Sequence, residues 1–220
     1  MSKTEKSAES IGIIGGSDGP TAVFFGEKKK RTIKQNIRKY SYEQRKKRMV
    51  RRIKPGTHTL DEVVSMLCDR YGFREISKDD AMYIEAYDNM RFSALMQHAP
   101  KLLGEFASPP ELKSRDEEGF RELQTQWEIR QQKAKEIPEE EFSIDLHLLE
   151  KREDEVEMHF EIETRFGHIG GGFSGPGKGE SRKYEKLFRE VYIYYGVTEE
   201  DIAGNTKRYQ ELVRVLAMRH

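Results

Sequence analysis

Cysteine is nearly absent from this sequence. Cys68 is the one cysteine among 220 residues, which excludes an internal disulfide and a metal cluster built on several cysteines. The first ten residues mix Lys and Glu and lack the basic and then apolar order of a secretory leader. Without a disulfide framework or a leader, we expect the protein in the reducing cytoplasm.

Long hydrophobic runs are also missing. Near the start, residues 10–26 carry no basic residue and no Glu, but they include five glycines. This stretch falls short of the roughly 20 apolar residues that a spanning helix needs, so we expect no transmembrane insertion. Hydrophobic residues make up only 35% of the chain, a low share that by itself would indicate disorder. Disordered chains also tend to carry a high net charge, however, and the formal net charge here is zero. A folded domain with a small core and a charged surface is therefore favoured over a disordered chain.

The zero net charge conceals a strong separation of charge. Residues 28–54 hold 14 Lys or Arg and one acid, Glu43, a balance of +13 that the rest of the chain offsets. Such a basic segment binds either an acidic surface of its own protein or an outside polyanion.

Periodicity predicts an α+β fold that is mainly helical. Helices are expected over 28–53 and 60–71, from residue 80 to Pro100, from Ser108 to residue 137, and over 184–195 and 209–216. Alternating apolar residues predict a C-terminal antiparallel β-hairpin at about 142–163, with a charged turn over 150–154. Two short apolar runs predict a second hairpin within 11–26. The expected organisation is a disordered tail over 1–10, a glycine-rich motif over 11–26, a basic helix or linker over 27–55 and a domain over 56–220.

The glycine-rich motif, residues 11–25, reads IGIIGGSDGPTAVFF. It resembles a signature of the β subunit of sodium-translocating decarboxylases, the family of the oxaloacetate, methylmalonyl-CoA and glutaconyl-CoA pumps. The family pattern is close to IGIIGGADGPTAIF, so Ser17 replaces Ala and Val23 replaces Ile. The resemblance covers about fifteen of the 220 residues and implies that Asp18 contributes to a path for Na⁺.

Such an aspartate works at membrane depth only inside a bundle of spanning helices. Here the motif is followed by Lys28, Lys29, Lys30 and Arg31 rather than by an apolar helix. We therefore interpret the chain as a non-enzymatic interaction or accessory protein, not itself a pump, with another protein as its expected partner. Membership of a decarboxylase complex is an alternative, and so is a plain hairpin turn at Asp18.

A second glycine-rich stretch partly matches a phosphate-binding loop. Gly172, Gly177 and Lys178 fit the G-x-x-x-x-G-K spacing, but Gly179 stands where Ser or Thr is needed. A flexible loop is the favoured interpretation.

The C-terminal hairpin offers a candidate metal site. Pairing Leu148 with Met158 sets His147 opposite His159 and Asp145 opposite Glu161 on the polar face. Two imidazoles and two carboxylates are suitable ligands for Zn²⁺, which makes a metal-supported enzyme one alternative. The other alternative is a solvated polar face.

The basic segment is the candidate for nucleic-acid contact, because Lys and Arg with tyrosines among them suit a phosphate backbone. A solvated linker, or a helix lying against acidic parts of the chain, is the competing interpretation. No G-x-S-x-G or H-E-x-x-H motif indicates an enzyme. The candidate contacts are Lys28, Lys29, Lys30, Arg31, Arg45, Lys46, Lys47, Arg48, Arg51 and Arg52.

Overall fold

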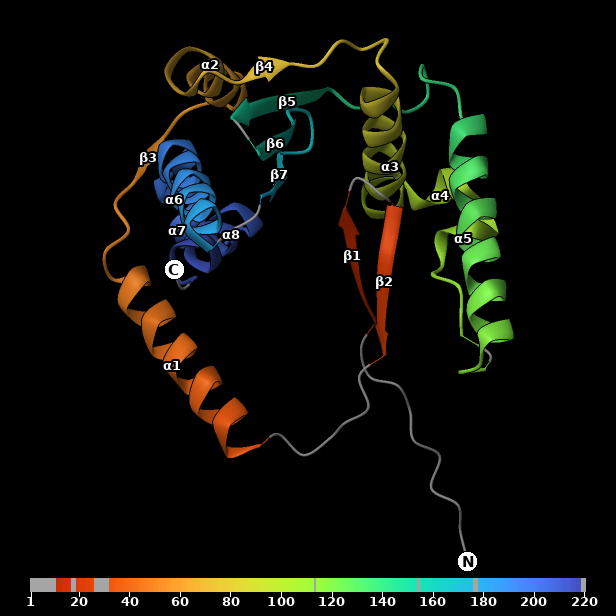
Figure 1. Ribbon diagram of the computed structural model, residues 1–220, viewed down its shortest axis with the longest axis horizontal. Coiled ribbons are helices and arrows are strands. Elements are labelled where there is room, and N and C mark those ends of the chain that lie inside the picture. The colour runs from red at the N-terminus through yellow and green to blue at the C-terminus, as the bar shows by residue number, and fades with distance from the viewer. Residues whose placement is uncertain are drawn as a thin grey trace, which may run out of the picture. The chain divides into compact units, whose positions relative to one another are not determined.

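The computed structural model describes residues 11–16, 19–25, 32–112, 114–153, 155–175 and 178–218. Its helices and strands confirm the predicted α+β class, mainly helical with a C-terminal hairpin (Figure 1). The helices are α1 (Ile33–Val50), α2 (Leu60–Tyr71), α3 (Ala81–His98), α4 (Pro100–Leu103), the 3₁₀ helix η1 (Gly104–Ala107), α5 (Glu117–Glu136), α6 (Lys178–Tyr195), α7 (Glu199–Gly204) and α8 (Lys207–Leu216).

The strands form three antiparallel groups. The N-terminal hairpin pairs β1 (Ile11–Gly16) with β2 (Gly19–Phe25), as predicted. A sheet with the order β4-β5-β6-β7 is built from β4 (Arg74–Glu75), β5 (Leu146–Glu153), β6 (Val156–Glu163) and β7 (His168–Ser174). The third group pairs β3 (Gly56–Thr57) with β8 (Gly196–Val197).

The chain divides into two compact units whose segments alternate along the sequence. Unit 1 takes its residues from 1–65, 153–157 and 172–220, and unit 2 from 66–152 and 158–171. The region 56–220 therefore contributes to both units.

Aromatic and aliphatic side chains fill the core of unit 2. Leu149 and Phe160 are fully buried, and the ring of Phe160 meets Phe73 edge to face at 5.4 Å. Between α3 and α5, Phe92 and Trp127 make a second edge-to-face contact at 6.0 Å. Such pairs add about 1 kcal/mol to the burial of their apolar surface.

A glycine allows the backbones of β3 and β8 in unit 1 to approach each other closely. Gly196, which ends α6 as predicted, has a φ of +60°, and a Cβ built there would lie 1.6 Å from the carbonyl oxygen of Gly56. The β3–β8 pair thus requires glycine at position 196 both for the backbone conformation and for space. Beside it, α6 and α8 pack around buried Val191, Val197 and Val213.

Two segments of the chain differ from the structure expected for them. The helix expected from Ser108 begins instead at Glu117, because the Asp116 carboxylate accepts from the amide of Gly119 at 2.9 Å and so provides the N-cap. The stretch expected as a flexible glycine-rich loop contains strand β7. β7 is an edge strand of the sheet.

Candidate nucleic-acid interface

Helix α1 carries the basic segment. It begins at a reciprocal cap, in which Thr32 Oγ1 accepts from the Gln35 amide at 3.3 Å and Gln35 Oε1 accepts from the Thr32 amide at 2.9 Å. None of its 18 residues is buried. Two of its apolar residues face solvent, since Ile37 is 63% exposed and Tyr40 is 64% exposed. Packing therefore stabilises this helix little.

The charge on α1 is almost wholly uncompensated. Ten Lys or Arg and one acid lie between residues 34 and 54. Among the residues described, the single ion pair of these cations joins Lys39 to Glu43 on the same helix, at 3.6 Å. No ion pair links α1 to a described carboxylate elsewhere in the chain. The structure therefore gives no support to the alternative of a helix held against acidic parts of the chain.

One side of the second half of α1 lies beside α8 in unit 1. Tyr42, Arg45 and Met49 are half-buried there, at the spacing of one helix face, whereas every residue from 32 to 40 is exposed. The contact positions the helix and leaves Lys46, Lys47 and Arg48 in solvent.

An aromatic stack follows α1 along the chain. The His58 and Tyr194 rings lie 3.7 Å apart between centroids and 8° from parallel. His58 Nδ1 is 2.9 Å from the Tyr194 carbonyl oxygen. A carbonyl oxygen can only accept, so Nδ1 carries the proton and donates it. The imidazole is therefore held in one orientation while His58 remains exposed.

A guanidinium stack lies next to this pair. Arg208 lies 3.8 Å from the centre of the Tyr195 ring, and its Nη2 donates to the carbonyl oxygens of Tyr195, at 2.7 Å, and of His58, at 3.5 Å. Arg208 also contacts Thr57 Oγ1 through Nη2 and lies 3.7 Å from Asp201. One arginine thus fixes the backbone on which His58 is mounted.

The pKa values of two neighbouring groups respond to this cluster. Burial raises the pKa of Tyr195, and the charge of Arg208 only partly opposes the shift. For Asp201, burial also raises the pKa, but hydrogen bonds from Thr198 and Thr206 and the charge of Arg208 outweigh it, so the pKa lies below its ordinary value. Asp201 stays ionised beside Arg208 at neutral pH.

The structure covers part of the predicted nucleic-acid contacts. Arg45, Lys46, Lys47 and Arg48 lie on α1, and Arg51 and Arg52 directly follow it. Four others, Lys28, Lys29, Lys30 and Arg31, lie outside the described residues, as does Asp18.

The structure does not bring the four predicted metal ligands together as a group. His147 Nδ1 lies 2.8 Å from a carboxylate oxygen of Glu75 on β4, and the Thr164 amide donates to the Asp145 carbonyl oxygen at 2.9 Å. Asp145 therefore lies opposite residue 164 rather than Glu161. The cause is the turn: β5 runs to Glu153 and β6 starts at Val156, so the turn is shorter than expected and the pairing is displaced.

The other two predicted ligands, His159 and Glu161, interact with each other. Burial raises the pKa of Glu161, and the neighbouring His159 lowers it only in part. Across the part of the chain that the structure describes, no group of three or more His, Cys, Asp or Glu residues is placed to hold a metal ion.

Two residues of the partial phosphate-loop match belong to a strand and a helix. Gly172 belongs to strand β7 and Lys178 is the first residue of α6, while Gly177 lies outside the described residues. The predicted loop therefore begins within a paired strand at Gly172.

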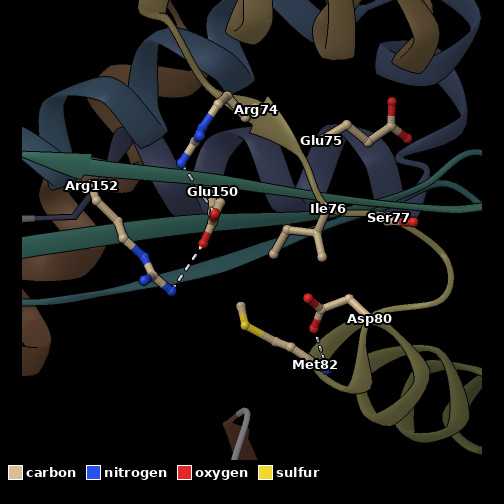
Figure 2. A pocket seen from close by; sticks show the side chains of 8 residues that line it. All are labelled: Arg74, Glu75, Ile76, Ser77, Asp80, Met82, Glu150 and Arg152. Atoms are coloured by element: carbon tan, nitrogen blue, oxygen red, sulfur yellow. Dashed lines mark hydrogen bonds and ion pairs between the residues drawn. The ribbon is translucent and has the colours of Figure 1, made fainter.

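Unit 2 contains a polar cavity of about 400 Å³ beside β4 (Figure 2). Arg74 and Arg152 converge on Glu150 from two strands, with Nη2 to carboxylate distances of 3.6 and 3.2 Å. Asp80 is engaged by the Met82 amide at 2.8 Å, as the N-cap of α3. The charges of this cavity are largely satisfied within the protein, in contrast to those of α1. The lining residues are Arg74, Glu75, Ile76, Ser77, Asp80, Met82, Glu150 and Arg152.

Sequence reasoning missed the His58–Tyr194 stack. The two residues are 136 positions apart and join only when β3 pairs with β8, through two residues on each side. No local signal marks such short strands.

Comparison with protein-family models, with curated proteins and with solved structures finds no match to this chain. Within the described ranges, no helix is both long enough and apolar enough to cross a membrane.

Proposed function

We propose that this chain is a non-enzymatic accessory protein that binds nucleic acid through α1 and the basic residues that follow it. The observation that carries the proposal is the exposed, uncompensated charge of α1. When the cations of α1 bind phosphates, the nucleic acid releases its counterions. This release supplies most of the binding free energy that is independent of nucleotide sequence.

Repulsion within α1 supports the same proposal. Lys34 and Arg38 are four residues apart on α1, and like charges at this spacing destabilise an isolated helix by a few tenths of a kcal/mol. A polyanion removes this repulsion when it binds. The helix is therefore better suited to a bound partner than to solvent.

The test is the salt dependence of binding. We expect the affinity for a fluorescently labelled RNA to fall steeply between about 50 and 200 mM salt. Replacing Lys34, Lys46 and Lys47 by Gln should weaken binding and lower the slope of log affinity against log salt by about 2.

A matched control removes the same number of positive charges from exposed positions outside α1. The triple variant of Lys78, Lys101 and Lys183 to Gln also removes three exposed lysines, and we expect it to bind like the parent. Absence of binding even at the lowest salt, or equal losses in the two triple variants, would contradict the proposal.

The β1–β2 hairpin supports a second candidate function, docking on a protein partner. These two strands form a sheet of their own among the described residues, and an unpaired strand edge is a site at which another protein adds a strand. The resemblance of residues 11–25 suggests a sodium-translocating decarboxylase as the partner.

A pull-down with the intact chain tests this docking. The matched bait carries residues 10–26 in scrambled order. Recovery of decarboxylase subunits by the intact chain alone supports docking, whereas identical recovery by both baits would remove it.

A further inference from the structure

We infer that the nucleic acid bound by this protein is single-stranded and that one of its bases stacks on the exposed face of His58. The inference rests on the proposed function, because α1 supplies the phosphate contacts. It adds the class of nucleic acid that α1 alone does not specify.

The first step is the geometry of the imidazole. Tyr194 covers one face of the ring at 3.7 Å, and no other described ring stacks on His58. His58 is exposed, which leaves its second face available to a further ring. A flat ring with one covered and one open face is a platform for a base.

The second step is the rigidity of the ring. The bond from Nδ1 to the Tyr194 carbonyl fixes the ring itself, and the His58 amide donates to the Tyr195 carbonyl at 3.3 Å. Arg208 also donates to the His58 carbonyl, at 3.5 Å. The ring is therefore already ordered before a base arrives, so little entropy is lost in binding.

The third step is the position of His58 after the basic helix. Lys54 precedes it by four residues, at most ~14 Å of extended chain, and Arg51 and Arg52 come just before. A strand whose phosphates follow α1 thus passes near this platform. Exposed Tyr40 offers a second flat ring within the helix itself.

Only a single strand meets this requirement. In a duplex each base has its faces covered by its neighbours, and proteins reach only the base edges in the grooves. An unpaired base presents a free face that stacks on an aromatic ring whatever its sequence. The same chemistry is offered by single-stranded RNA and single-stranded DNA.

The experiment compares four labelled probes of one sequence: single-stranded RNA, single-stranded DNA, and a duplex of each. With the unmodified protein we expect either single strand to bind about tenfold more tightly than its duplex at equal salt. The RNA and DNA arms then show which strand is preferred. In His58→Ala, binding of the single strand should weaken about tenfold, with the salt slope and the duplex affinity unchanged.

Two further measurements keep the result independent of folding. His58→Phe retains a flat ring but loses the Nδ1 bond to Tyr194, so it should restore most, but not all, of the binding of the single strand. A single strand with abasic sugars keeps every phosphate but has no base that could stack on the ring. It should therefore bind the unmodified protein about tenfold more weakly than the intact strand, and it should bind His58→Ala no worse than the intact strand does.

The outcomes separate the two proposals. If α1 binds all probes in proportion to their phosphates, and neither the abasic strand nor His58→Ala differs from its parent, base stacking is overturned while nucleic-acid binding stands. If no probe binds at low salt, the proposed function itself fails.

Discussion

The guanidinium of Arg91 on α3 donates a 2.7 Å hydrogen bond to the carbonyl oxygen of Ala134 in the last turn of α5. The same side chain also donates to Ile137 at 2.6 Å and to Phe142 at 3.0 Å. Arg91 is only 6% exposed. A buried cation is thus satisfied by carbonyls at the negative end of a helix, which ties two helices and the entry to the β-hairpin together.

Replacing Arg91 by Ala should lower the free energy of unfolding by about 3 kcal/mol or more, because several buried carbonyls would lose their donor. Arg91→Lys keeps the positive charge but loses the planar guanidinium, so its free energy of unfolding should lie between those of the parent and of Arg91→Ala. The control is Arg121→Ala on the exposed surface of α5, where loss of the pair with Glu117 should cost less than about 1 kcal/mol. Urea unfolding followed by circular dichroism measures all three. Equal losses at positions 91 and 121 would be evidence against this role.

A second prediction concerns the β3–β8 pair. Gly196→Ala places a methyl group where the Gly56 carbonyl already lies and forces a left-handed φ on alanine. We therefore expect α6 and β8 to lose their contact with β3 and the melting temperature to fall sharply. Gly179, near the start of the same helix, has no atom within 4 Å of a built Cβ. Gly179→Ala should therefore raise stability by up to about 1 kcal/mol. Thermal melts distinguish the two, and a neutral result at position 196 would show that β3 and β8 do not pair as described.

Several helices could be predicted because their signals are local. Thr59 and Glu62 make the reciprocal cap that their spacing predicts, at 3.2 and 2.7 Å, and Asp80 caps α3. By contrast, Thr198 and Asp201 form the same kind of cap for α7, a helix that the sequence analysis did not predict. Its signal, Thr-Glu-Glu-Asp, was available but lacks an apolar run behind it.

Long-range pairing explains what could not be predicted. Strands β3, β4 and β8 have two residues each, too few for any period to be visible. The candidate site divides in the same way: the charges of α1 are evident in the sequence, whereas the contact of His58 with Tyr194 depends on the fold. A change in turn length was enough to separate Asp145 from Glu161.

Glu161 gives a pH prediction. Burial raises its pKa in the folded protein above the ordinary value of about 4.3. The folded state then binds the proton more tightly than the unfolded state, so stability falls as the pH rises from that ordinary value through the raised one. Glu161→Gln carries no charge and should be more stable than the parent at pH 7, with a difference that shrinks toward pH 4. Urea titrations at several pH values test this, with exposed Glu155→Gln as the control. A difference that grows on acidification would reverse the sign and exclude the explanation.

The last prediction sets the stability of α1 against its binding. Lys34 lies in the first turn, which contains no acid, and Arg38 lies four residues further on. Lys34→Glu should stabilise the helix, because a carboxylate there favours the helix dipole and pairs with Arg38, each by a few tenths of a kcal/mol or more. Amide hydrogen exchange in α1 should therefore slow. Nucleic-acid affinity should fall instead, and by more than in Lys34→Gln, since a phosphate contact becomes a repulsion. If exchange slows and affinity is unchanged, the first turn of α1 does not face the nucleic acid, and the cations on residues 45–52 alone would have to account for binding.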